Sequence, residues 1–225
     1  MTTSIPDIAF LFDVDNTLLD NDRFQGELRD HLQRSHGPQA CENYWAAFET
    51  LRSESGYADY IGALERLRLD RLHDPKILAL SNWLLDYPFA DLLYPDAHDV
   101  VRHVRQWGPA AILSDGDAVF QPRKIDRSGL WRTFDGQVLI YVHKEEELAD
   151  VERWRPAKHY VLIDDKLRIL DAVKKIWGNR VTTIFPRQGH YAHDTTALAE
   201  IPPADIAIDS IGDLLKFDLT ALRAA

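Results

Sequence analysis

The chain has 225 residues, of which 45% are hydrophobic and 28% are charged, and its formal net charge is -10. This composition excludes a disordered chain, and the length predicts one large α/β unit or a core with a smaller appended part. The 26 lysines and arginines are dispersed and form no basic block, which argues against a polyanionic partner such as duplex DNA.

The sequence contains no pattern typical of export, membrane insertion or disulfide pairing. Its single cysteine, Cys41, excludes an internal disulfide. The start MTTSIPDIAF lacks the basic-then-apolar pattern of a secretory signal, and no apolar run approaches the length that spans a membrane. We therefore expect a cytoplasmic monomer or homodimer whose partner is a small molecule, with neither nucleic acid nor membrane bound.

Four short apolar runs each end in a polar residue. Near-continuous apolar runs of strand length, separated by helix-like segments, indicate strands buried on both faces of a parallel sheet. Ligands bind beyond the carboxyl ends of such strands, so these polar side chains are expected to converge on one crevice. The runs are residues 8–12 before Asp13, 110–113 before Ser114, 138–142 near Lys144 and 160–163 before Asp164, with further strands expected at 181–185 and 204–209.

Residues of about 20–92 have a different pattern, because they contain several amphipathic helices in succession and no convincing strand. The last of these helices is expected to begin at Asp74-Pro75, with aspartate as N-cap and proline at the first helical position. We therefore predict an α/β fold in which residues 1–19 and 93–225 form a doubly wound parallel sheet with its helices, and residues 20–92 form an inserted helical domain.

The expected crevice has a consistent chemistry. Carboxylates gathered there would repel one another unless a cation were present, and Mg²⁺ prefers carboxylate and phosphate oxygens. One aspartate can attack phosphorus, while a second carboxylate protonates the leaving alcohol and later activates water. A lysine, a hydroxyl and backbone N–H groups would bind the phosphoryl oxygens. The candidates for these groups are Lys144, Ser114 and the loop from Val14 through Asn16 to Thr17.

These motifs resemble those of the haloacid dehalogenase (HAD) superfamily over residues 8 to about 215. DVDNT at 13–17 resembles the first motif, Asp-x-Asp-x-Thr, and ILSDG at 112–116 resembles the second. Lys144 stands where the third-motif lysine would fall, and VLIDD at 161–165 resembles the acidic fourth motif in its paired-aspartate form. The helical insertion resembles the helical (C1) cap of the family, and the sheet its Rossmann-like core.

The resemblance implies a role for each matching residue. Asp13 would be the nucleophile, Asp15 the general acid and base, and Thr17 a support for the loop. Mg²⁺ would be held by Asp13, the backbone carbonyl of Asp15, and the fourth-motif acids, with Asp165 as direct ligand and Asp164 acting through water. An acid at position 15 also indicates phosphoryl transfer, because breaking a carbon–halogen bond requires no proton for an alkoxide. The leading interpretation is a Mg²⁺-dependent phosphatase acting on a small phosphorylated metabolite.

Other interpretations stay open at this point. A phosphomutase would use the same residues and return the phosphoryl group to a sugar. A non-enzymatic, phospho-accepting receiver-like domain also gathers acids, a hydroxyl and a lysine at strand ends, although the order of its motifs differs. Asp13 and Asp15 could also simply cap a helix beginning at Thr17.

The lysine of the site has competing candidates. Lys144 could be a surface residue paired with Glu145 or Glu147, because three acids follow it directly. Lys124, expected in the helix after the second strand, competes for its role. Lys158 competes as well, although it precedes its strand and is expected at the wrong end of the sheet.

Overall fold

A six-stranded parallel sheet forms the centre of the structure, a computed structural model that describes residues 5–69 and 71–218. The strand order is β3-β2-β1-β4-β5-β6, so the chain winds outward from β1 in both directions. This confirms the predicted doubly wound α/β fold, including the fifth strand and a shorter sixth one. The strands are β1 (Ile8–Phe12), β2 (Ala110–Asp115), β3 (Val138–Tyr141), β4 (His159–Ile163), β5 (Val181–Pro186) and β6 (Ile206–Ile208).

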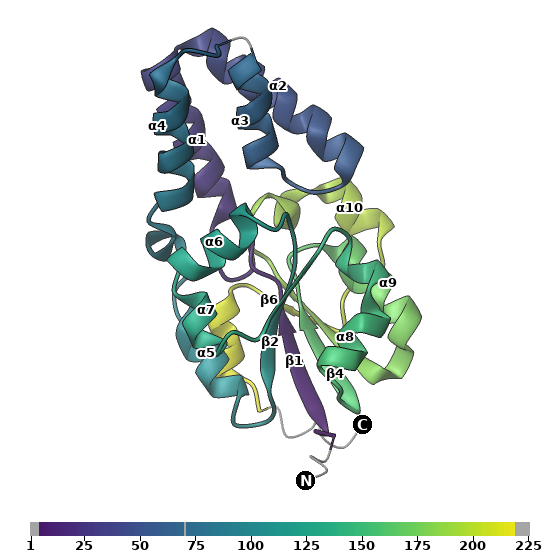
Figure 1. Cartoon of the computed structure of the whole chain (residues 1–225). Helices are drawn as coiled ribbons and strands as arrows, with labels where there is room; N and C mark the ends of the chain where they lie inside the picture. Colours follow the sequence, from purple (N-terminus) through teal and green to yellow (C-terminus); the bar gives the residue numbers. More distant parts are fainter. Residues whose placement is uncertain (1–4, 70, 219–225) are drawn as a thin grey trace.

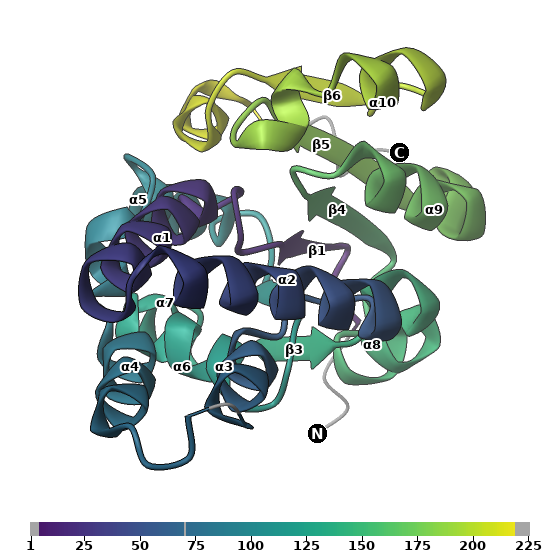
Figure 2. The same ribbon diagram turned by 90° about the horizontal axis from the view of Figure 1, so that it is seen from above.

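Each face of the sheet has its own layer of helices, because successive residues of a strand point to opposite faces. Phe10 and Phe12 of β1 pack on one side, whereas Ala9 and Leu11 pack on the other. Fully burying a large apolar side chain contributes about 1.5–3 kcal/mol, so both layers stabilise the sheet. Figure 2 shows the two groups on either side of the strands. They are α5 (Ala97–Val104), α6 (Phe120–Arg127) and α7 (Leu130–Thr133) on one side, and α8 (Leu148–Trp154) and α9 (Leu167–Trp177) on the other.

Between β1 and β2 the chain leaves the sheet and forms four consecutive helices, which lie above the carboxyl ends of the strands (Figure 1). The last one begins as predicted, because the side chain of Asp74 accepts a hydrogen bond from the N–H of Lys76 and Pro75 takes the first helical position. No helix within the described ranges is long and apolar enough to cross a membrane. The four helices are α1 (Asn21–His36), α2 (Pro38–Ser55), α3 (Tyr60–Leu69) and α4 (Pro75–Asp86).

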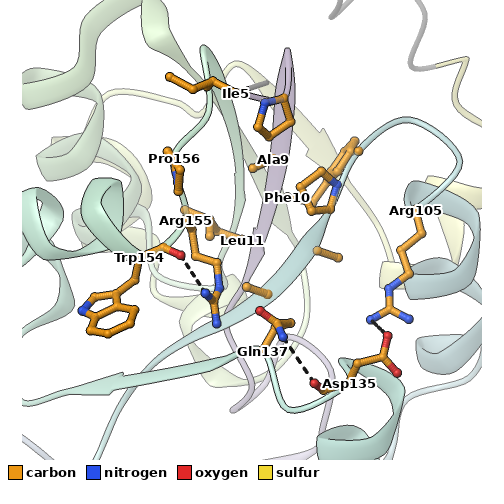
Figure 3. Close-up of a pocket in the computed structure, with 15 residues that line it drawn as sticks. Ile5, Ala9, Phe10, Leu11, Arg105, Asp135, Gln137, Trp154, Arg155 and Pro156 are labelled. Atoms are coloured by element: carbon orange, nitrogen blue, oxygen red, sulfur yellow. Dashed lines mark hydrogen bonds and ion pairs between the residues drawn. The ribbon is translucent and has the colours of Figure 1, made fainter. Parts of the chain in front are cut away.

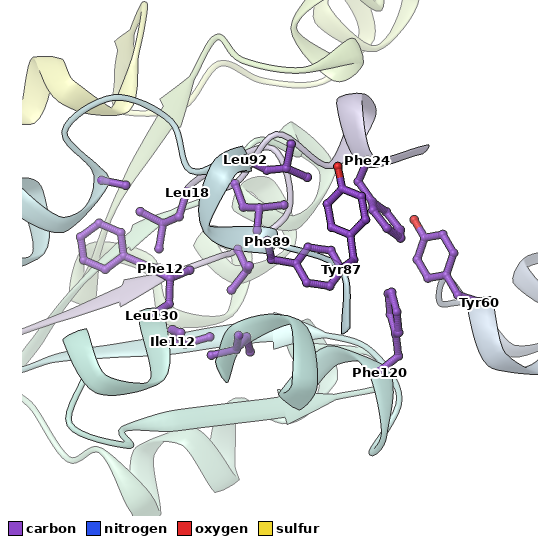
Figure 4. Close-up of a cluster of buried hydrophobic side chains, with 14 of the residues drawn as sticks. Phe12, Leu18, Phe24, Tyr60, Tyr87, Phe89, Leu92, Ile112, Phe120 and Leu130 are labelled. Carbon is purple, nitrogen blue, oxygen red and sulfur yellow. The ribbon is translucent and has the colours of Figure 1, made fainter. Parts of the chain in front are cut away.

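The four helices α1 to α4 form what we call the helical layer, and the sheet with its own helices forms the core. The helical layer and the core meet in a cluster of aromatic side chains (Figure 4). Phe24 of α1 and Tyr60 of α3 face Phe120 of α6. The ring centroids of Phe24 and Tyr60 are 5.3 Å apart, and those of Tyr60 and Phe120 are 4.9 Å apart. Aromatic pairs at such distances add about 0.5–1.5 kcal/mol each to the burial of their area, so this junction holds the helical layer onto the core.

One buried cluster joins the helical layer to the core. The division of the chain into a core domain and a cap domain of residues 20–92 therefore stays a prediction. The helices α1 to α4 lie within that segment. Residues 1–4, 70 and 219–225, which the predicted domains include, lie outside the described residues.

Candidate active site

The loop after β1 places two aspartates at the carboxyl end of the central strand. Asp13 is buried, whereas the side chain of Asp15 is 22% exposed. Helix α1 begins only at Asn21, with Asp20 as its N-cap, so no helix starts at Thr17. The interpretation that the aspartates cap a helix there is therefore wrong.

A buried trio of acids, Asp13, Asp164 and Asp165, joins the ends of β1 and β4. Each offers a carboxylate oxygen within 4.8 Å of the others. The Thr17 hydroxyl bridges the two strand ends, because it donates to Asp13 Oδ2 at 3.4 Å and accepts the N–H of Asp165 at 3.1 Å. Both side-chain oxygens of Asp165 are buried with no hydrogen-bond donor among the described residues. Orphaned carboxylate oxygens beside two further carboxylates are costly alone and fit a hard divalent cation.

Lys144 lies against this trio. Its Nζ is 2.6 Å from Asp13 Oδ1 and 2.6 Å from Asp164 Oδ2, and its side chain is 1% exposed. The interpretation of Lys144 as a surface lysine paired with a neighbouring glutamate is therefore wrong. The ion pair with Lys144 occupies Asp164, whereas both oxygens of Asp165 have no hydrogen-bond partner among the described residues. The assignment of Asp165 as direct ligand and of Asp164 as a ligand through water stays a prediction.

Burial determines the protonation of these groups. It raises the pKa of Asp164 to about 6, although Lys144 acts in the opposite direction. Burial also raises the pKa of Asp165 well above its ordinary value. For Lys144, burial alone would lower the pKa, but Asp13 and Asp164 outweigh it and raise the pKa, so the ammonium stays charged. Without a cation, Asp164 and Asp165 therefore resist ionisation.

The end of β2 contributes a hydroxyl and a further acid. The Ser114 hydroxyl is buried and accepts a hydrogen bond from Gln121 Nε2 at 3.0 Å, and the same Nε2 lies 3.4 Å from Asp15 Oδ2. Asp115 Oδ1 accepts the backbone N–H of Lys144 at 2.9 Å, so this carboxylate orients the loop after β3. Sequence reasoning missed Gln121, which links the second motif to the first.

The two lysines that competed with Lys144 occupy other places. Lys124 of α6 is fully buried, and its Nζ lies 2.7 Å and 2.9 Å from the two carboxylate oxygens of Asp15. Lys158 lies just before β4, exposed, and pairs with Asp7 at 2.8 Å. The structure therefore brings Lys144 to Asp13 and Lys124 to Asp15, a pairing that sequence reasoning did not foresee.

The two remaining predicted phosphate-binding residues have contacts within their own loop. Asn16 has a φ of 59°, and its Oδ1 accepts the N–H groups of Asn21 and Asp22 at 3.0 Å and 3.2 Å. Asn16 thus ties the loop to the first turn of α1. Thr17 connects Asp13 to Asp165, as described above. Contact of Asn16 or Thr17 with phosphate stays a prediction.

A cavity of about 190 Å³ lies at this end of the sheet, lined by the loop after β1, the helical layer and the core. Drug-sized ligands occupy about 300–1,000 Å³, so this cavity suits a smaller molecule. Arg52 Nη2 donates to the Tyr191 hydroxyl at 2.8 Å and thereby joins the helical layer to the core. Besides Asp15, Asp115 and Asp165, the lining includes Gln25, Arg52 and Tyr57 of the helical layer and Lys166, His190 and Tyr191 of the core.

A larger cavity, of about 800 Å³, lies at the opposite end of the sheet, where the strands begin (Figure 3). Ala9 near the start of β1, Gln137 before β3 and Arg155 before β4 line it. The charged groups on its rim include Arg105 and Asp135, whose ion pair measures 3.0 Å. Asp15 and Asp165 line the smaller cavity and are absent from this one, so the candidate chemistry belongs to the smaller cavity.

Comparison with known proteins relates the chain to solved structures, whereas no protein-family model and no curated protein matches it. It is 57% identical to a haloacid dehalogenase-like hydrolase of Burkholderia xenovorans LB400, over 95% of this chain and 99% of that one, with a TM-score of 0.90. It also resembles an L-2-haloacid dehalogenase of Xanthobacter autotrophicus (18% identity, 95% and 98% covered, TM-score 0.60). A magnesium-bound HAD-hydrolase of Bacillus subtilis is similar too (16% identity, 94% and 100% covered, TM-score 0.59). The last two likenesses show a shared fold.

Proposed function

The chain belongs to the haloacid dehalogenase-like hydrolases, and from this premise we propose that it is a Mg²⁺-dependent phosphatase acting on a small phosphate monoester. The observation that supports this proposal most is the carboxylate of Asp15 on the wall of the small cavity, beside the buried trio. An alkoxide leaving group needs a proton from such an acid, whereas a halide does not. The small volume of the cavity supports a substrate of a few carbon atoms.

The residues at the trio fit Mg²⁺. Asp13, Asp165 and the backbone carbonyl of Asp15 would hold the ion, with Asp164 beside it and paired with Lys144. When bound, Mg²⁺ offsets the charge of the carboxylates and polarises the phosphoryl oxygens. The magnesium bound to the Bacillus subtilis relative is consistent with this assignment.

The side chains of the site then divide the reaction into two steps. An oxygen of Asp13 attacks phosphorus and the bond from phosphorus to the substrate alcohol breaks, while Asp15 gives its proton to that alcohol. Water next attacks the aspartyl-phosphate and gives a proton to Asp15, and cleavage of the bond from phosphorus to Asp13 releases phosphate. The positive charge of Lys144, beside Asp13, and the Ser114 hydroxyl would stabilise the negative phosphoryl oxygens.

Phosphate release from p-nitrophenyl phosphate in Mg²⁺ tests this proposal. The protein should release many phosphates per molecule, and Asp13→Asn should abolish release, while Asp209→Asn, at an exposed acid, should leave it unchanged. A single phosphate per molecule would indicate a receiver-like domain, and transfer to a sugar instead of water a phosphomutase. Halide released from 2-chloropropionate, without phosphatase activity, would replace the proposal with a dehalogenase.

A further inference from the structure

The proposed reaction uses Asp15 but gives no role to Lys124, the buried lysine beside it. The Lys124 side chain is fully buried. Its Nζ lies 2.7 Å and 2.9 Å from the two oxygens of Asp15 and 3.1 Å from Asn21 Oδ1. An ammonium group has three N–H donors, and these three contacts use all of them. Lys124 therefore has no donor left for a substrate oxygen, so its role concerns Asp15 itself.

The surroundings of Lys124 hold its ammonium group in one place. Its Nζ lies 5.5 Å, 5.6 Å and 5.9 Å from the ring centroids of Phe120, Tyr60 and Phe24. Figure 4 shows that these rings gather at the junction of α6 with the helical layer. Among the described residues, Asp15 is the one carboxylate within ion-pair distance of Lys124. A buried ammonium is costly unless it is paired, and aromatic faces stabilise it further, so this arrangement is specific.

Asp15 itself lies at the boundary between this apolar region and the cavity. Its side chain is 22% exposed and lines the cavity, whereas its other side meets Lys124 and Gln121. A short carboxylate at the end of a loop would otherwise sample several rotamers. Two bonds from a fixed ammonium hold both of its oxygens, which restricts the carboxylate to one orientation toward the cavity.

The same ammonium connects Asp15 to the helical layer. Asn21, which accepts the third bond from Lys124, is the first residue of α1. Its Nδ2 lies 3.4 Å from the Tyr60 hydroxyl, which also accepts a bond from Gln25 Nε2 at 3.0 Å. The position of the Asp15 carboxylate is thus linked through Lys124 to α1 and α3.

We propose that Lys124 is a positioning residue that fixes the carboxylate of Asp15 at the cavity wall. Through Asn21, the position of this carboxylate then depends on how α1 packs on the core. The inference rests on the proposed phosphatase function, in which Asp15 gives a proton to the leaving alcohol. A displacement of about 1 Å in a reacting group costs about 10²-fold in rate, which sets the expected effect.

Lys124→Met tests the role, since methionine fills similar space without donors. The value of kcat/KM should fall about 10²-fold for ethyl phosphate, whose alkoxide needs a proton, and less than about threefold for p-nitrophenyl phosphate, whose leaving group does not. Lys158→Met, at an exposed lysine, should change kcat/KM for neither ester.

In the Asp15→Asn background, Lys124→Met should have no further effect, because residues that act through one another are non-additive. Asn21→Ala, a milder change, should show the same substrate preference with about a three- to tenfold loss if Lys124→Met fails to fold.

Equal losses on both esters, or full additivity with Asp15→Asn, would overturn the proposal. A crystal structure of Lys124→Met, or of Asn21→Ala if that variant alone folds, gives an answer independent of activity: the Asp15 carboxylate should leave its present position, and an unmoved carboxylate would refute the role. If the unmodified protein hydrolyses neither ester, the phosphatase proposal fails by itself, and the crystal structure still decides whether Lys124 positions Asp15.

Discussion

Acidification should release Mg²⁺ from this protein at a pH where ordinary carboxylates still bind it. Metal binding requires ionised ligands, so protons compete with the ion for the buried trio. Burial raises the pKa of Asp164 to about 6, and it raises that of Asp165 in the same direction. Asp164 is therefore mostly ionised at about pH 7.5 and mostly protonated at about pH 5.

The size of the effect follows from that pKa. Between about pH 7.5 and pH 5, a single competing proton with a pKa of about 6 raises the apparent Kd about tenfold. Protonation of Asp165 acts in the same direction, so tenfold is a lower limit. A site made of exposed carboxylates, with ordinary pKa values of about 4, would change its Kd by only about 10%.

The metal-free protein should show the corresponding dependence of stability on pH. A carboxyl group with a raised folded pKa contributes stability that is fully present below its unfolded pKa of about 4 and is lost as the pH rises through about 6. For Asp164 this contribution is about 3 kcal/mol, from about two pKa units at about 1.4 kcal/mol each. Mg²⁺ should therefore raise the unfolding temperature more at neutral pH than at about pH 5.

Calorimetric titration of chelator-treated protein with Mg²⁺ at the two pH values measures this effect, and thermal unfolding with and without Mg²⁺ provides a second readout. Asp165→Asn should abolish binding, whereas Asp209→Asn, at an exposed acid, should leave it unchanged. A Kd that differs less than about twofold between the two pH values would refute the reasoning. Unaltered binding by Asp165→Asn would also refute the assignment of the ligand.

Three further substitutions test other parts of the site. Lys144→Met leaves Asp13 without its buried partner, so the free energy of unfolding in thermal melts should fall by about 3–5 kcal/mol. Phosphate release should also fall, by at least about 10²-fold. An unchanged melting temperature would contradict the buried pair. Ser114→Ala should lower kcat/KM about 10- to 100-fold while changing the unfolding free energy by less than about 1.5 kcal/mol, and wild-type kinetics would remove the hydroxyl from the site. Gly189→Ala places a Cβ 2.5 Å from Asn16 Cγ at a φ of +66°, so urea unfolding should show a loss of about 1–3 kcal/mol, and unchanged stability would contradict this close approach.

The sequence alone determined the sheet and the location of the acids. The apolar runs before Asp13, Ser114 and Asp164 predicted buried parallel strands, and the carboxyl ends of such strands share one edge. The two acid pairs therefore had to approach each other once the strand order was given. The helix beginning at Pro75 was also predictable, because its cap and its proline are local signals.

The partners of the buried lysines could be decided only by the tertiary structure. Lys144 is 131 residues from Asp13, and Lys124 is 109 residues from Asp15, so no local period relates them. Lys124 faces inward because α6 packs under the helical layer, where Arg123 of the same helix pairs with Asp86 of α4 at 2.8 Å. Strand and helix patterns repeat over a few residues and are visible in the sequence, whereas the choice of ion-pair partner depends on how distant elements pack.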